Sequence, residues 1–182
     1  MNLKRFIILD RDGTITEECD HLSDPEQVKL IPGSASGMRK LRQLGLGLVV
    51  ITNQSVIGSG VINFARLEEI HGRLLELLRQ ENVWVEKIYV CPHKPNDNCS
   101  CRKPKTELAR QAAEEFQFDP RQSFVVGDKV CDIELGKQIG AITILVRSGH
   151  GRKYDPQDTP PDYVVNNLEE SANLIETLLR KK

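Results

Sequence analysis

The stretch FIILDRDGT, residues 6–14, joins a short apolar run directly to two aspartates and a glycine. Residues 6–9 are all apolar and show no polar alternation, which is typical of a strand covered by helices on both faces. Asp10 and Asp12 follow two residues apart, and Gly13 allows a tight turn after them. This pattern predicts a buried parallel strand with a functional site at its carboxyl end.

Further strands and helices are predicted to alternate along the chain. Five more apolar runs indicate strands at Leu48–Thr52, Lys87–Cys91, Phe124–Val126, Ile142–Val146 and Tyr163–Val165. Helical periodicity between them indicates helices at Ser34–Leu44 before Gly45, at 64–78 after Asn63, at Thr106–Phe116, at Val130–Ile139, and after Asn167 with Glu170 as a capping-box partner. The alternation predicts an α/β fold with a doubly wound, mostly parallel sheet.

Composition limits the protein to a few classes. The 182 residues, 39% of them hydrophobic, suit a single domain over residues 1–182. Lys plus Arg (25) nearly equals Asp plus Glu (26), so there is no overall positive field and we expect no nucleic-acid partner. The apolar run near the N-terminus is too short for a signal peptide or a membrane span. We therefore expect a cytoplasmic monomer with no membrane partner.

Polar residues follow several of the predicted strands. TNQS (52–55) ends the second strand, GDKVCD (127–132) ends the fourth, and Arg102 and Lys103 lie after the third. Any one of these residues alone could be a turn former or a solvated cap. Together, Asp10, Asp12 and Asp128 form a hard-oxygen set suited to Mg²⁺, and the Thr52 hydroxyl and the Lys103 ammonium could meet a phosphoryl group beside it.

A second group of polar residues indicates a zinc-binding loop at 91–103. The spacing C-x-H-x5-C-x-C offers four ligands for one closed tetrahedral Zn²⁺ site, from Cys91, His93, Cys99 and Cys101. A redox centre would favour C-x-x-C, which is absent, and a catalytic zinc would keep one position for water. We therefore expect a structural zinc that orders the loop and so places Arg102 and Lys103.

Four motifs carry a family resemblance over nearly the whole chain. DRDGT (10–14), TNQS (52–55), RKP (102–104) and GDKVCD (127–132) resemble the ordered motifs of the haloacid-dehalogenase-like phosphatases. The cysteine loop, with VVITNQS, LSDPEQV and FVVGDK, resembles the branch that contains D-glycero-D-manno-heptose 1,7-bisphosphate 7-phosphatase and the histidinol-phosphate phosphatase domain. The gaps after Gly13 and after Thr52 are too short for the large cap domain of many relatives, so we expect an open pocket.

The resemblance implies a role for each motif residue. Asp10 would be the nucleophile that forms an aspartyl-phosphate, and Asp12 would protonate the leaving oxygen and later take a proton from water. Mg²⁺ would be held by Asp10, the main-chain carbonyl of Asp12, and Asp128. Thr52 and Lys103 would hold the equatorial phosphate oxygens. The implied substrate-binding residues are Arg11, Asn53, Gln54, Ser55, Arg102 and Lys129, whereas Asp132 could be either a supporting residue or a helix first-turn carboxylate.

The expected substrate is a small phosphorylated sugar. The resemblance favours hydrolysis of the 7-phosphate of D-glycero-D-manno-heptose 1,7-bisphosphate in nucleotide-heptose biosynthesis, with a histidinol-phosphate phosphatase or another small sugar-phosphate phosphatase as the alternative. Two segments depart from the heptose enzymes and bear on the substrate. Residues 56–60 read VIGSG, without the usual arginine, and residues 18–21 read ECDH, where His21 is a candidate ligand contact.

Other classes of protein fit less well. A receiver-type phosphoacceptor module is also doubly wound, but it needs an aspartate at the end of the third strand, where this chain has Cys91. A zinc-stabilised binding protein descended from a phosphatase would not need every catalytic position, and all are present. His71 falls within an amphipathic helix and His150 lies outside the motifs, so both are expected to be structural.

Overall fold

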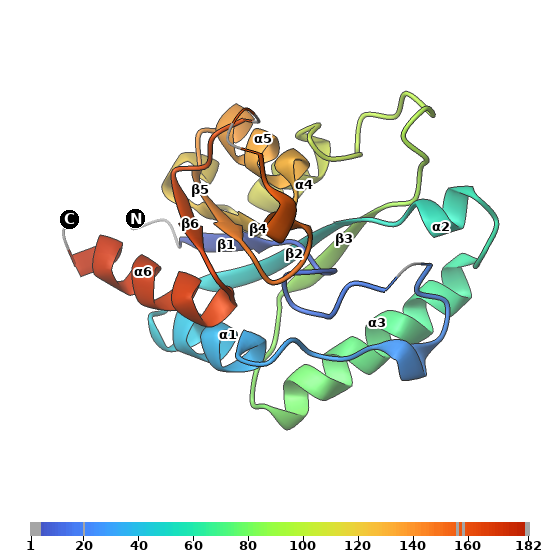
Figure 1. Cartoon of the computed structure of the whole chain (residues 1–182), viewed down its shortest axis with the longest axis horizontal. Helices are drawn as coiled ribbons and strands as arrows, with labels where there is room; N and C mark the ends of the chain where they lie inside the picture. The colour runs from blue at the N-terminus through green and yellow to red at the C-terminus, as the bar shows by residue number, and fades with distance from the viewer. Residues whose placement is uncertain (1–4, 20, 156, 158, 181–182) are drawn as a thin grey trace.

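The computed structural model describes residues 5–19, 21–155, 157 and 159–180 and contains a six-stranded parallel sheet between two layers of helices (Figure 1). The predicted doubly wound α/β fold is confirmed. All six predicted strands are present, and two run slightly beyond their predicted ends. They are β1 (Phe6–Leu9), β2 (Gly47–Asn53), β3 (Lys87–Cys91), β4 (Phe124–Gly127), β5 (Ile142–Val146) and β6 (Tyr163–Val165).

The strand order positions the functional site. The order is β3-β2-β1-β4-β5-β6, and Leu9 of β1 is in register with Val50 of β2 and Val126 of β4. The winding direction of the sheet reverses between β1 and β4, and ligands of such sheets bind beyond the carboxyl ends of the strands at that point. Receiver modules have the order 2-1-3-4-5 instead. The fold therefore gives no support to the receiver alternative.

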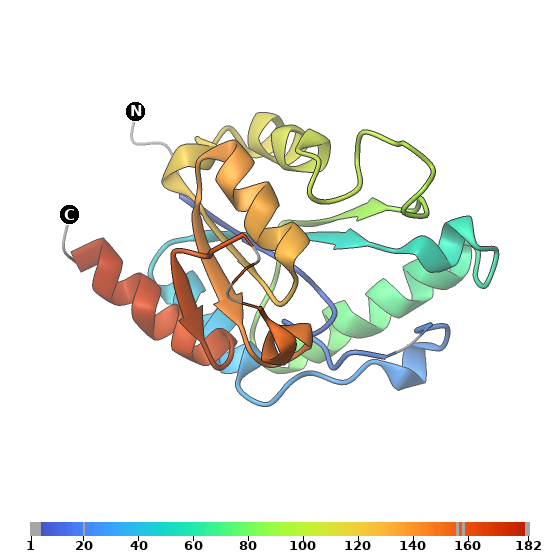
Figure 2. The ribbon, with the colours of Figure 1, turned by 45° about the horizontal axis from the view of Figure 1, so that its top comes forward.

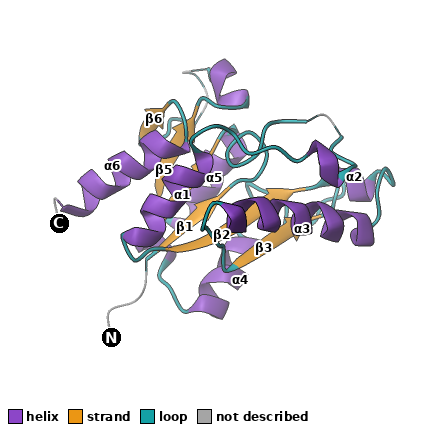
Figure 3. Cartoon of the chain, turned by 90° about the horizontal axis from the view of Figure 1, so that it is seen from below, coloured by secondary structure: helices purple, strands orange, loops and turns teal. Residues whose placement is uncertain are grey.

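Helices cover both faces of the sheet, as the apolar strands predict. One layer contains α1 (Ser34–Gln43), α3 (Phe64–Gln80) and α6 (Leu168–Arg180), which lie in front of the sheet in Figure 3. The other layer contains α4 (Glu107–Phe116) and α5 (Val130–Ile139). Residues of β1 alternate between the two cores, with Ile7 and Leu9 in one and Phe6 and Ile8 in the other. Each such buried side chain contributes about 1.5–3 kcal/mol.

The ends of the helices follow from local hydrogen bonds. Asn63 caps α3, because its side chain accepts a bond from the backbone N–H of Arg66 at 2.9 Å. The Asn167 side chain likewise accepts the N–H of Glu170 at 2.9 Å at the start of α6. The expected return bond is shifted by one residue, since the Glu170 carboxylate accepts the N–H of Asn166 at 2.9 Å. The predicted capping box is therefore only half formed.

Several short elements were not predicted. They are the single-turn helix α2 (Ser55–Gly58) and the 3₁₀ turns η1 (Pro25–Gln27), η2 (Pro120–Gln122) and η3 (His150–Lys153). Local caps begin η1 and η2, where Asp24 accepts the Glu26 N–H and Asp119 accepts the Arg121 N–H. The other short elements depend on contacts that are distant in the sequence. In α2, for example, Gly58 N–H donates to the Pro92 carbonyl at 2.9 Å, which ties this turn to the loop after β3.

The carboxyl edge of the sheet is open. Figure 2 shows the long loop after β3 standing at the same end of the sheet as α2. Within the described ranges, the connections from β1 to α1 and from β2 to α3 contain only the short elements η1 and α2, so no cap domain is inserted there. No helix among the described residues is both long and apolar enough to span a membrane.

Candidate active site

Lys103 and Asp10 meet at the carboxyl end of β1. The Lys103 Nζ donates to Asp10 Oδ1 at 2.7 Å and to the Ile51 carbonyl at 2.6 Å, and it lies 2.7 Å from Asp132 Oδ1. The lysine side chain is only 3% exposed. Burial alone would lower the pKa of Lys103, but the two carboxylates outweigh it and raise that pKa. A fixed positive charge therefore lies directly beside the Asp10 carboxylate.

The backbone of Lys103 is held by Asn53, the last residue of β2. Asn53 Oδ1 accepts the Lys103 N–H at 3.0 Å, and Asn53 Nδ2 donates to the Lys103 carbonyl at 3.2 Å. This reciprocal pair links β2 to the end of the cysteine loop. Lys103 is thus held at two points, through its main chain by Asn53 and through its ammonium group by the contacts with Asp10, Asp132 and the Ile51 carbonyl.

Asp12 lies within a network of donors. Gln54 Nε2 donates to Asp12 Oδ2 at 2.9 Å and to the buried Thr52 Oγ1 at 2.7 Å. Thr16 Oγ1 lies 3.2 Å from Asp12 Oδ1. Burial would raise the pKa of Asp12, but the neighbouring Arg11 guanidinium and the Gln54 amide together lower it. Asp12 is therefore an ionised carboxylate in this structure.

The Arg11 side chain turns into the protein and is 2% exposed. Its Nε and Nη2 donate to the two Asp12 carboxylate oxygens at 2.9 and 2.8 Å. Its Nη1 lies 3.1 Å from Nε2 of His71 on α3. Arg11 was expected to contact substrate, and in this structure its guanidinium contacts Asp12 and His71.

Asp128 carries an unsatisfied oxygen at the end of β4. Its Oδ2 accepts the His150 N–H at 2.6 Å, whereas its buried Oδ1 has no hydrogen-bond partner. Burial and the charge of Asp10 raise the pKa of Asp128 to about 8. A Cβ on Gly13 or on Gly149 would lie 2.2 Å from Asp128 Oδ2, so only glycine fits at either position. Backbone thus packs directly against this carboxylate.

The chemistry of these groups fits a divalent cation. Carboxylate oxygens of Asp10, Asp128 and Asp132 all lie within 4.8 Å of one another. Asp132 is already satisfied, because it pairs with Lys103 and accepts the Lys129 N–H at 3.0 Å. Asp10 and the orphaned Asp128 Oδ1 therefore remain as oxygen ligands, a hard set of the kind that Mg²⁺ prefers.

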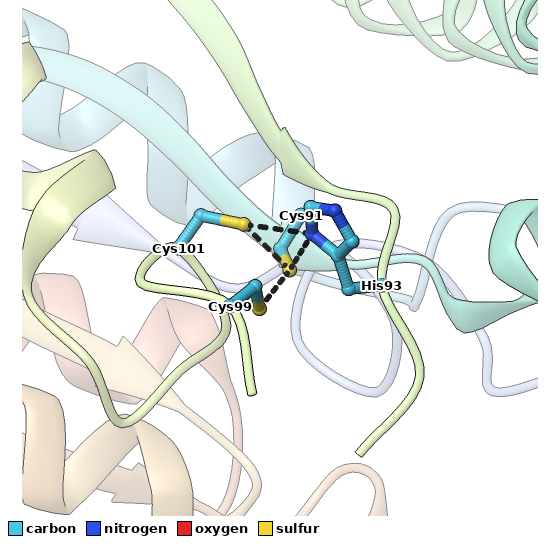
Figure 4. A group of neighbouring side chains, drawn as sticks. All are labelled: Cys91, His93, Cys99 and Cys101. Atoms are coloured by element: carbon cyan, nitrogen blue, oxygen red, sulfur yellow. Dashed lines mark hydrogen bonds between the residues drawn. The ribbon is translucent and has the colours of Figure 1, made fainter. Parts of the chain in front are cut away.

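The four predicted zinc ligands converge after β3, and their side chains point toward one another in Figure 4. The Cys91 Sγ lies 3.6 Å from the Cys99 Sγ, 3.7 Å from the His93 Nδ1 and 2.9 Å from the Cys101 Sγ. A tetrahedron with metal–sulfur bonds of about 2.3 Å has edges of about 3.8 Å. No disulfide joins these cysteines. Two of the three distances lie close to this edge and the Cys91–Cys101 distance is shorter, and three thiols with one imidazole are the ligand types of a closed Zn²⁺ site.

Open space lies beyond β4 and β5. One cavity of about 480 Å³ is bordered by Glu18, Ser148, His150 and Arg152, and a second of about 270 Å³ reaches Asp128. Cavities of this size accommodate a small metabolite.

The comparisons with known proteins agree with this geometry. Residues 100–171 match a family model described as HAD-hydrolase-like. Over 178 residues the chain is 34% identical to D-glycero-beta-D-manno-heptose-1,7-bisphosphate 7-phosphatase of Bordetella bronchiseptica, covering 97% of this chain and 99% of that one. The chain belongs to this 7-phosphatase family of haloacid-dehalogenase-like phosphatases. The resemblance inferred from the four motifs is confirmed.

A solved structure and a more distant relative support the same family. The crystal structure of D,D-heptose 1,7-bisphosphate phosphatase from B. bronchiseptica, complexed with magnesium and phosphate, has a TM-score of 0.89 and 34% identity and covers 98% of this chain and 99% of its own. The histidine biosynthesis bifunctional protein HisB of Actinobacillus pleuropneumoniae is 30% identical over 165 residues, which cover 89% of this chain and 43% of HisB. The 7-phosphatase family is thus related to HisB.

The remaining predicted residues of this 7-phosphatase family member lie on several different segments. Ser55 begins α2, and Arg102 donates to the His93 carbonyl at 3.0 Å within the cysteine loop. Lys129 Nζ lies 3.2 Å from both carboxylate oxygens of Glu18. His21 is exposed, and the neighbouring Asp20 lies outside the described residues.

Sequence reasoning missed three contacts of the site. Asp132, left open between two roles, is 1% exposed and pairs with Lys103. His150 and His71, expected to be structural, contact Asp128 and Arg11 respectively. The four-residue spacing in GDKVCD could have indicated that Asp132 turns back to the strand end. No local pattern indicates either histidine contact, because each forms only when distant segments meet.

Proposed function

We propose that this chain is a magnesium-dependent phosphatase that hydrolyses the 7-phosphate of D-glycero-D-manno-heptose 1,7-bisphosphate in nucleotide-heptose biosynthesis. The observation that carries the proposal is the buried Lys103–Asp10 contact of 2.7 Å beside the unsatisfied Asp128, at the reversal point of the sheet. Similarity along 97% of the chain to a named 7-phosphatase supports the choice of substrate.

Asp10 is the proposed nucleophile. Its carboxylate oxygen attacks phosphorus, and the bond between phosphorus and the sugar oxygen breaks to leave a phosphate ester on Asp10. The Lys103 ammonium beside Asp10 reduces the repulsion between this carboxylate and the incoming phosphate dianion, and it stabilises the negative charge on the phosphoryl oxygens. The Thr52 hydroxyl, next to Gln54, supplies a further hydrogen bond to these oxygens.

Asp12 is the proposed proton carrier. The Asp12 pKa is lowered in the ligand-free structure, so Asp12 first takes up a proton when the negative charge of the incoming phosphate raises that pKa. It gives this proton to the sugar oxygen as that oxygen leaves, and it then accepts a proton from the water that attacks the aspartyl-phosphate. This second attack releases inorganic phosphate and restores the Asp10 carboxylate. Gln54, which donates to both Asp12 and Thr52, keeps the proton carrier and the phosphate-binding hydroxyl in register.

Two metal sites complete the proposal. Mg²⁺ would be held by Asp10, the main-chain carbonyl of Asp12, and Asp128. When bound, it neutralises phosphate charge that would otherwise repel the carboxylates. Zn²⁺ would be held by the Cys91, His93, Cys99 and Cys101 set, with a placement role only. Arg102, Ser55 and Lys129 remain proposed contacts for the sugar or its second phosphate.

The whole proposed mechanism uses residues of one chain. We therefore propose that residues 1–182 act as a single phosphatase domain, with the zinc loop at 91–103, and that a monomer is sufficient for activity.

Steady-state phosphate release tests the function. The purified protein should hydrolyse D-glycero-D-manno-heptose 1,7-bisphosphate with a kcat/KM well above its values for hexose bisphosphates, and added EDTA should abolish the reaction. Asp10→Asn should be inactive while remaining folded by circular dichroism. Magnesium-independent turnover, or full activity of Asp10→Asn, would contradict the mechanism.

Histidinol phosphate is the alternative substrate. The similarity to HisB over 89% of the chain favours its inclusion in the same assay. A higher kcat/KM for histidinol phosphate than for the heptose bisphosphate would overturn the proposed substrate but would leave the mechanism in place.

A further inference from the structure

Arg11 has a contact set that the proposed mechanism does not use. Its buried guanidinium donates through Nε and Nη2 to both oxygens of Asp12, at 2.9 and 2.8 Å. The third nitrogen, Nη1, lies 3.1 Å from the His71 Nε2. Two parallel bonds fix the guanidinium relative to the carboxylate, and the third contact anchors it to α3. His71 is 60 residues away from Arg11 in the sequence.

The chemistry of arginine determines the protonation state of His71. A guanidinium has five N–H donors and no acceptor, so the His71 Nε2 must accept the hydrogen bond. A histidine that accepts at Nε2 is neutral and carries its proton on Nδ1. Burial and the charge of Arg11 lower the pKa of His71 to about 4, which agrees with a neutral ring.

We propose that His71 and Arg11 form a positioning pair for the Asp12 carboxylate. The inference rests on the proposed function, in which Asp12 protonates the leaving oxygen. Proton transfer of this kind depends on the placement of the acid within hydrogen-bond reach of the oxygen. His71 fixes the Arg11 guanidinium, and Arg11 in turn fixes both oxygens of Asp12. Neither residue needs to touch the substrate for this effect.

Two substrates with different leaving groups can show whether His71 positions Asp12 or only supports the fold. The alkoxide of a sugar phosphate needs a proton to leave, whereas p-nitrophenolate leaves without one. His71→Leu keeps the bulk of the side chain but removes the acceptor. We expect it to lower the single-turnover rate of sugar release from the heptose bisphosphate about tenfold or more, and to leave the pre-steady-state release of p-nitrophenolate nearly unchanged. The first step is measured because Asp12 acts as the base in the later attack of water for both substrates.

Two matched variants sharpen the comparison. His71→Gln retains an acceptor oxygen for Arg11, and we expect it to restore most of the activity toward the sugar phosphate. Glu68→Gln lies on the exposed side of the same helix and should leave both substrates unaffected. Equal losses of His71→Leu on both substrates, or no rescue by His71→Gln, would overturn the positioning role.

A measurement on the wild-type protein tests the contact without activity. Nitrogen-15 NMR of the histidine rings should show His71 as the neutral Nδ1–H tautomer, and an Nε2–H tautomer or a charged ring would overturn the pair. This test holds even if His71→Leu fails to fold. If the wild-type protein hydrolysed neither substrate, the proposed function would fail, whereas an Nδ1–H tautomer would still support the contact.

Discussion

The ammonium nitrogen of Lys103 lies 2.7 Å from Oδ1 of Asp10, although the two residues are 93 positions apart in the sequence. The same nitrogen lies 2.7 Å from Asp132 Oδ1, so one buried cation is shared by two carboxylates. Removing the lysine would leave the two carboxylates buried without a positive charge, and a buried charge without a partner lowers the stability of the folded state. The site is therefore a stability element as well as a catalytic one.

Lys103→Met should unfold more easily and lose activity. It leaves Asp10 and Asp132 buried without their cation, which we expect to lower the free energy of unfolding by about 3–5 kcal/mol in metal-free protein. Urea titration measures the change. The double variant Lys103→Met/Asp132→Asn removes one of the two unpaired charges and should recover part of the stability but none of the activity. A Lys103→Met protein as stable and as active as wild type would contradict both roles.

Asp128 should make the metal-free protein less stable as the pH rises. Its pKa is raised from an ordinary 3.8 to about 8, so the folded state binds this proton more tightly than the unfolded state does. The contribution of Asp128 to the free energy of unfolding is therefore fully favourable below about pH 4, and it is lost as the pH rises to about 8. In EDTA, the Tm of Asp128→Asn should exceed that of wild type by an amount that grows over this range.

Magnesium should reverse the difference in Tm between wild type and Asp128→Asn. Added Mg²⁺ should raise the Tm of wild type and not that of Asp128→Asn, because only the carboxylate offers a charged ligand oxygen. Equal Mg²⁺ responses of the two proteins would show that Asp128 does not hold the metal.

Zinc removal should weaken both stability and activity. Metal analysis should find about one equivalent of zinc, and Cys99→Ser should lower both the Tm and kcat, since Lys103 is the last residue of the loop. Ser100→Ala is a matched control, because Ser100 is exposed between two of the proposed ligands. If zinc-free Cys99→Ser retained full kcat, the loop would not place Lys103.

Gly13→Ala should lose all activity but only part of its stability. Gly13 has a φ of 79°, and a Cβ there would lie 2.2 Å from Asp128 Oδ2. Gly45 has a similar φ of 78°, but a Cβ there would meet nothing within 4 Å. Gly45→Ala should therefore cost about 1–2 kcal/mol of backbone strain and keep full activity. Equal activities of the two variants would show that the contact with Asp128 is not required.

Much of the architecture was predictable because it depends on short-range patterns. Each strand is an uninterrupted apolar run, and each long helix shows an apolar stripe, so the burial of both faces of the sheet follows from the residues themselves. Short elements such as α2 were not predictable, since a four-residue turn has no periodicity and depends on bonds such as Gly58 to Pro92.

The candidate site was predictable in its residue types but not in its contacts. The motifs indicated Asp10, Lys103 and Asp128. One carboxylate or lysine at the end of a strand is common, but several of them in the order of the four motifs are not. The pairing of Asp132 with Lys103 and the inward turn of Arg11 toward His71 were not predictable. Each depends on the direction of a side chain after folding, which the residue type does not specify.

By itself, the sequence determined the sheet class, the edge of the sheet that carries the polar residues, and the two sets of metal-ligand types. Only the tertiary structure decided which carboxylate shares Lys103, which oxygen of Asp128 lacks a partner, and what holds Asp12 in place. The physical reason is the range of the interactions. Burial patterns repeat every two to four residues and can be read locally, whereas a hydrogen bond forms only when two groups come within about 3 Å, whatever their separation along the chain.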